Sequence, residues 1–311
     1  MLLLGTRSTG DLEFLRYILH AAYSASLAWY LARTGPAFSE LPVITAPRLL
    51  RWRGGSWLPV VIVTFAFLVV LADEGGGDIV LLLLILGTFG ILLAYWRRIR
   101  LRWLLQGLLI AVVAYLAGRI PTDNGLLSER ALTLLAGLAA PMYMAGAVIH
   151  DRTGLGGLPL AKWDLYAVGR GWLWGLVLFL PMGMVNAASG SPGGELAWVS
   201  EWWMPLVLPW FSGLAEEVWF RLLMVGLVYL LLRPAFSHRP ALTVTLAIIF
   251  SSVVFGLGHG YNLERLVVTG LLYGAPLAVI FTKRGWEHAV GGHYMINAIP
   301  WLFAFLEHQT L

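Results

Sequence analysis

Residues 205–232 read P-L-V-L-P-W-F-S-G-L-A-E-E-V-W-F-R-L-L-M-V-G-L-V-Y-L-L-L. The run exceeds the about 20 mostly apolar residues that a membrane helix needs. Its charged residues are Glu216, Glu217 and Arg221. A charged side chain at the centre of a membrane helix costs about 2.5–3.5 kcal/mol on insertion scales and marks a functional candidate. The stretch therefore predicts a membrane helix that carries a functional polar group.

The composition of the whole chain agrees with a membrane protein. Of its 311 residues, 59% are hydrophobic and 12% are charged, whereas a soluble domain carries about 25% charged residues. The net charge of +4 is explained by arginines in cytoplasmic loops, so we expect no nucleic-acid partner. The absence of cysteine excludes disulfides, thiolate metal sites and a cysteine nucleophile. The first residues lack the layout of a cleavable signal peptide.

The apolar runs predict an all-α, polytopic transmembrane bundle of about nine spans, within a range of eight to ten. The expected spans cover residues 57–72, 79–96, 103–118, 131–149, 171–188, 205–232, 241–258, 264–281 and 288–306. Segment 12–32 contains Glu13, Arg16 and His20, so it is either an interfacial amphipathic helix or a tenth span.

The order of these spans suggests three regions. Residues 1–56 form an N-terminal helix and a basic connector, 57–190 are accessory transmembrane helices, and 191–311 are a catalytic transmembrane core. Basic loops, such as the one with Lys283 and Arg284, should be cytoplasmic. We expect a multi-pass protein of the cell membrane, in the bacterial inner membrane, with lipids as its surroundings.

Polar residues gather in the last hundred positions. On one helix, Glu217 and Arg221 are four apart and can form an ion pair on one face, which leaves Glu216 free. His293 and Asn297 have the same spacing, and His259 follows Phe255 by four. A carboxylate in an apolar site can act as a general base, and an amide can donate to an oxyanion. The group is sufficient for water-mediated amide hydrolysis, although a buried ion pair or an interhelical hydrogen bond would explain single members.

Three short motifs resemble a known family. E-E-V-W-F-R at 216–221 matches E-E-x-x-x-R, F-G-L-G-H at 255–259 matches F-x-x-x-H, and H-Y-M-I-N at 293–297 matches H-x-x-x-N. In order and spacing they are similar to the CPBP intramembrane proteases. These include the type II CAAX-prenyl endopeptidases and the bacteriocin-processing and immunity proteins called Abi. The resemblance covers residues 200–306.

The resemblance implies a role for each motif residue. Glu216 would activate the attacking water with help from His259, and Glu217 and Arg221 would order the helix. His293 and Asn297 would stabilise the oxyanion.

The resemblance leaves the cofactor open, since the family is described both as a glutamate protease and as a metalloprotease. No cofactor is required in the first view. In the second, Glu216, His259 and His293 would hold zinc. The expected substrate is a membrane-associated peptide, a prenylated or leader peptide, or a membrane protein.

Two other classes of function fit the same polar residues: a proton-coupled membrane transporter, and a non-catalytic membrane immunity or scaffold protein. The expected site also conflicts with the expected topology. If the spans are straight, His259 lies near the outer face and His293 nearer the inner one, about 15 Å apart along the membrane normal. We nevertheless expect all six candidate residues to line one cavity, because each is costly in lipid.

Overall fold

A computed structural model describes residues 9–35, 57–72, 76–119, 129–189 and 199–309. Within these ranges the chain forms helices and connecting turns and no strand, so the predicted all-α class is confirmed. Most of the predicted basic connector, residues 36–56, lies outside the described residues.

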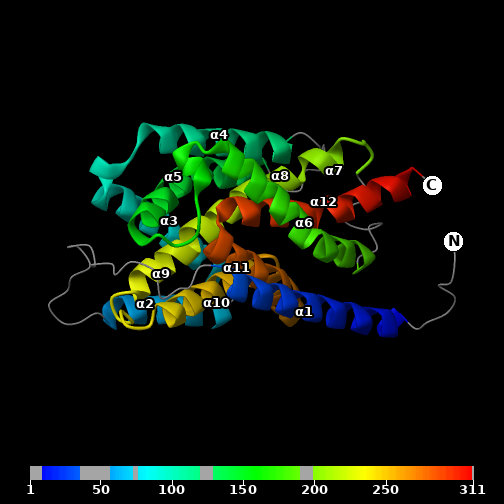
Figure 1. Cartoon of the computed structure of the whole chain (residues 1–311), viewed down its shortest axis with the longest axis horizontal. Coiled ribbons are helices and arrows are strands. Elements are labelled where there is room, and N and C mark those ends of the chain that lie inside the picture. Colours follow the sequence, from blue (N-terminus) through cyan, green and yellow to red (C-terminus); the bar gives the residue numbers. More distant parts are fainter. Residues whose placement is uncertain (1–8, 36–56, 73–75, 120–128, 190–198, 310–311) are drawn as a thin grey trace.

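The first half of the chain contains the following helices: α1 Thr9–Thr34, α2 Trp57–Ala72, α3 Gly76–Ala94, η3 Trp96–Arg98, α4 Leu101–Arg119, α5 Glu129–Thr153, η4 Pro159–Lys162 and α6 Leu165–Ser189. The second half contains α7 Met204–Val207, α8 Pro209–Phe211, η5 Ser212–Val225, α9 Gly226–Leu232, α10 Pro240–Gly258, η6 Arg265–Gly274, α11 Ala275–Arg284 and α12 Trp286–His308. In Figure 1, α11 lies between α4 and α5 on one side and α1 and α10 on the other, and α12 crosses α6.

Six of the described helical segments are long and apolar enough to cross a membrane: Leu101–Arg119, Leu132–Thr153, Leu165–Ala188, Pro240–Gly258, Arg265–Arg284 and Trp286–His308. Two shorter apolar helices cover Val60–Val69 and Ile79–Ala94. The predicted span 205–232 is helical but is divided among α7, α8, η5 and α9. The count of nine spans is therefore not confirmed. Segment 12–32 lies in α1, which is not among the six.

The helix that carries Glu216 departs from regular α-helical geometry. Pro205 and Pro209 stand at the starts of α7 and α8, where the missing N–H of proline is tolerated. From Ser212 to Val225 the chain then forms a π-helix, in which each hydrogen bond joins residues five apart. π-Helical turns occur often at functional sites. The sequence predicted ordinary α-helical spacing here.

Helices α6 and α12 lie side by side (Figure 1) and approach each other closely through glycines. A Cβ added at Gly175 would collide with the His288 carbonyl, and one at Gly291 would collide with the Trp172 carbonyl. Small residues allow two membrane helices to bring their backbones into contact. This packing fixes α12, the helix that carries His293 and Asn297.

Helices α10 and η6 also meet through glycines, just before His259. A Cβ at Gly256 would lie 2.8 Å from the Gly270 Cα and from the Arg265 carbonyl oxygen. His259 follows the last residue of α10 as its C-terminal cap. The close contact therefore sets the position of the His259 ring relative to η6.

Candidate active site

The Glu216 carboxylate lies between the two histidines of the second and third motifs. Its Oε2 atom is 3.5 Å from His259 Nε2 and 3.7 Å from His293 Nε2. Residues from η5, the end of α10 and α12 thus meet at one oxygen atom. The expected separation of about 15 Å along the membrane normal is wrong.

The first turn of α12, the helix that carries His293, is buried. Trp286 is 2% exposed and Glu287 is 3% exposed, so this helix begins inside the bundle and not at its surface. The connection between α5 and α6 covers it: the Trp286 N–H donates to the Gly157 carbonyl, and Glu287 accepts from the Leu160 N–H at 2.8 Å.

Each histidine is held through its Nδ1 atom. His259 Nδ1 is 2.8 Å from the Phe255 carbonyl oxygen, and His293 Nδ1 is 2.7 Å from Glu217 Oε1. Because both partners are acceptors, we assign the ring hydrogen to Nδ1 in each case. A neutral imidazole then has a lone pair at Nε2. With both imidazoles neutral, the two Nε2 atoms and the Glu216 carboxylate would all be acceptors, and a donor such as a water molecule could bridge them.

Glu217 and Arg221 form the ion pair that their spacing predicts. Arg221 Nε lies 3.4 Å from Glu217 Oε2, and both side chains are fully buried. The Arg221 Cζ also lies 4.4 Å from the centroid of the Phe255 ring, which is a cation–π distance. The first two motifs are therefore joined through Arg221 and Phe255.

Two cavities adjoin the polar residues. One, of about 460 Å³, is lined by Glu216, His259 and Asn297 together with aromatic side chains that include Trp219 and Trp301. The other, of about 180 Å³, is lined by His259, His293, Asn297 and several polar residues. Glu217 and Arg221 line neither of these two cavities. The expectation that all six candidate residues line one cavity is therefore wrong. Four of them face one or both of these two cavities, and Glu217 and Arg221 lie behind them in the protein interior.

Ser212 is a further residue of the site, which the three motifs do not include. Asn297 Nδ2 donates to Ser212 Oγ at 2.6 Å, and Ser212 Oγ donates to the Pro209 carbonyl at 3.3 Å. This chain of hydrogen bonds fixes the orientation of the Asn297 amide. The spacing offered a signal in the sequence, because Ser212 precedes Glu216 by four residues. In the structure Ser212 also lines the larger cavity.

The predicted zinc ligands were Glu216, His259 and His293. Within the described ranges, no group of three or more His, Cys, Asp or Glu side chains has an arrangement that could hold a metal ion. Zinc binding and the absence of any required cofactor both stay predictions, and the steps below use only the side chains of the protein.

Comparison with known proteins adds one match. No curated protein and no solved structure matches the chain. A family model described as "Type II CAAX prenyl endopeptidase Rce1-like" matches residues 198–299, about a third of the 311-residue chain. The matched segment includes Glu216, His259 and Asn297 and falls within the predicted core 191–311, although the division into three regions stays a prediction. Together with the apolar helices, the match supports a multi-pass membrane protein. Residues 198–299 are thus similar to the Rce1-like type II CAAX prenyl endopeptidases, in agreement with the CPBP resemblance of the three motifs.

Proposed function

We propose that the protein is an intramembrane endopeptidase in which Glu216 activates a water molecule for hydrolysis of a peptide bond. The observation that carries the proposal is the meeting of Glu216 Oε2 with His259 Nε2 and His293 Nε2, beside a cavity that Glu216 and His259 line. The family match at residues 198–299 supports the same class of reaction.

The three acceptors suggest how water is held and activated. One hydrogen atom of the water is donated to Glu216, and its second hydrogen atom is donated to an imidazole Nε2. Glu216 takes the first proton as the water oxygen attacks the carbonyl carbon, and a tetrahedral intermediate forms. The proton is then delivered to the amide nitrogen, the C–N bond breaks, and a carboxylic acid and an amine are released. Transfer by such a base contributes about 10²- to 10⁴-fold to the rate.

Asn297 is the neutral donor for the oxyanion in this scheme. With Nδ1–H fixed on both rings, neither neutral imidazole has an Nε2–H to donate. One N–H of the Asn297 amide is engaged by Ser212, and the amide has a second N–H that can face the developing charge. A histidine becomes a donor at Nε2 only after it accepts a proton. We therefore assign the two histidines to water positioning and proton transfer.

The larger cavity suggests the class of substrate. Its aromatic residues, including Trp219, Phe220 and Trp301, offer an apolar surface next to the catalytic carboxylate. Such a wall suits an apolar side chain or the lipid-modified part of a membrane-associated peptide, a prenylated one included. Both a peptide and a membrane protein can present such an apolar group to the cavity.

The test is a comparison of protein termini in cells that contain the wild type and cells that contain Glu216→Gln. We expect a set of new termini that appears only with the wild type, and the purified wild type should cut the corresponding peptides in proteoliposomes without an ion gradient. Gradient-driven uptake without cleavage would instead identify a transporter. The absence of both cleavage and uptake would identify a scaffold or immunity protein.

A further inference from the structure

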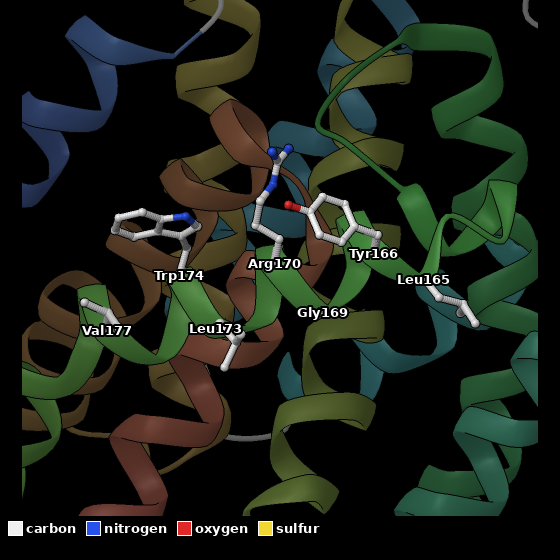
Figure 2. A pocket seen from close by; sticks show the side chains of 7 residues that line it. All are labelled: Leu165, Tyr166, Gly169, Arg170, Leu173, Trp174 and Val177. Atoms are coloured by element: carbon white, nitrogen blue, oxygen red, sulfur yellow. The ribbon is translucent and has the colours of Figure 1, made fainter.

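The outer face of α6 presents two rows of side chains. Tyr166, Arg170 and Trp174 are spaced by four residues and point the same way from the helix (Figure 2). The Arg170 Cζ lies 5.7 Å from the centroid of the Tyr166 ring. The neighbouring row consists of Leu165, Gly169, Leu173 and Val177, and together the two rows line an open hollow of about 590 Å³.

The second row has a gap at Gly169. A Cβ added at this position would meet no heavy atom within 4 Å. Gly169 also lines another cavity, of about 430 Å³, between α6 and α4. Apart from Glu287 its lining is apolar, and it includes Leu109, Val113 and Trp172. The two hollows therefore adjoin at a glycine, where no side chain separates them.

The polar end of this surface is positively charged. Arg170 and Arg284 both lie near enough to His288 to act on it electrostatically, and the His288 ring borders the backbone at Gly171. No ion pair within the described ranges involves Arg170. The carboxylate beside this region, Glu287, is 3% exposed and accepts a hydrogen bond from the Leu160 N–H. Arg170 is thus an exposed cation that is available to an anion.

We propose that the two hollows bind one anionic membrane phospholipid. The phosphate pairs with Arg170, and an acyl chain crosses Gly169 into the apolar cavity between α6 and α4. A guanidinium forms strong, charge-assisted hydrogen bonds with phosphate, and anionic lipids concentrate near basic residues at the cytoplasmic surface. The bilayer around the helices supplies both parts of such a ligand. The site uses none of the catalytic residues, so it does not depend on the proposed function.

The test measures lipid binding to the purified full-length chain by native mass spectrometry. Phosphatidylglycerol is compared with phosphatidylcholine of the same acyl chains. The first molecule of phosphatidylglycerol to bind should do so about tenfold more tightly than the first molecule of phosphatidylcholine, which corresponds to about 1.4 kcal/mol. Arg170→Gln should remove most of this preference. Arg97→Gln is the matched control, because Arg97 is also exposed and lies 5.2 Å from the centroid of an aromatic ring, that of Trp96.

A second pair of variants tests the acyl-chain cavity. Gly169→Leu fills the gap and should weaken the binding of both lipids by about tenfold. Gly90→Leu is its control, because a Cβ at Gly90 also meets nothing within 4 Å. Thermal unfolding in detergent confirms that each variant is folded. Equal losses in Arg170→Gln and Arg97→Gln, or no preference for phosphatidylglycerol in the wild type, would overturn the proposal. Equal effects of Gly169→Leu and Gly90→Leu on lipid binding would show that the acyl chain does not enter the cavity at Gly169.

Discussion

Glu217 accepts a hydrogen bond from His293 Nδ1 at 2.7 Å, across 76 positions of the chain. The second oxygen of the same carboxylate, Oε2, lies 3.4 Å from Arg221 Nε. One buried carboxylate therefore orients a histidine of the candidate site and balances the charge of an arginine behind it. Glu217 is a positioning residue in this arrangement, whereas Glu216 faces the cavity.

The Glu217–Arg221 pair should be strongly coupled in stability. The Arg221 nitrogens have no hydrogen-bond partner within the described ranges, so the charge of Glu217 is the main compensation for burying the guanidinium. Breaking a buried pair costs about 3–5 kcal/mol, because the remaining charge is left uncompensated. We expect Arg221→Met and Glu217→Gln each to lower the free energy of unfolding by this amount.

The double variant Glu217→Gln/Arg221→Met completes the cycle. It should be less destabilised than the sum of the two single variants, by about 0.5–3 kcal/mol. Chemical unfolding of the purified proteins in detergent gives the three values. Additive losses would show that the two side chains do not compensate each other. The exposed Arg239 offers a control, since Arg239→Met should change stability by only about 0.5 kcal/mol.

Glu216→Gln should separate chemistry from folding. The side chain of Glu216 is 23% exposed, and glutamine keeps its shape while it loses the basic oxygen. We expect turnover of a cleavable peptide to fall about 100-fold or more, with little change in the unfolding midpoint and in peptide binding. Glu201→Gln, at an exposed carboxylate, is the control and should leave turnover unchanged. A fully active Glu216→Gln protein would assign the base to another residue.

Asn297 and Ser212 should contribute unequally to the rate. If Asn297 donates to the oxyanion, Asn297→Ala should lower kcat about 10²- to 10³-fold, which is the usual loss for one such donor. Ser212→Ala removes only the group that orients the amide, so its effect on kcat should be smaller. Steady-state kinetics on one peptide measures both. An equal or larger loss in Ser212→Ala would show that the hydroxyl itself acts in the reaction.

Local features of this protein could be read from its sequence. Apolar runs of sufficient length predicted the helices, and four-residue spacing predicted the Glu217–Arg221 pair, because both depend on neighbours along one helix. The cost of charge in lipid selected Glu216, His259 and His293, which meet at one carboxylate oxygen.

Features that depend on packing between distant segments could not be read in the same way. The bond from Glu217 to His293 joins two helices, and no spacing rule indicates it. The buried start of α12 likewise depends on a distant segment, because Glu287 accepts a hydrogen bond from the Leu160 N–H. The expected separation of His259 and His293 assumed straight spans, and it does not hold, because both rings lie next to Glu216 Oε2.

The contact between Gly256 and Gly270 should control both stability and the position of His259. A Cβ at Gly256 would lie 2.8 Å from the Gly270 Cα, the Gly270 N and the Arg265 carbonyl oxygen. All three are backbone atoms, so α10 and η6 must move apart in Gly256→Ala. Overpacking of this kind costs about 1–3 kcal/mol. His259 lies three residues further along, and its 3.5 Å contact with Glu216 should lengthen. We therefore expect Gly256→Ala to lower both the unfolding midpoint and peptide turnover.

Gly258→Ala is the matched control for stability. It lies on the same helix two residues later, and a Cβ there meets no heavy atom within 4 Å. Its unfolding midpoint should stay close to that of the wild type, because substitutions without new contacts change stability by about 0.5 kcal/mol or less. If Gly256→Ala were as stable as Gly258→Ala, the two helices would not be in the tight contact described. If Gly256→Ala lost stability but kept full turnover, the His259 ring would be positioned by groups other than this contact, and the Phe255 carbonyl that holds its Nδ1 atom would be the first to examine.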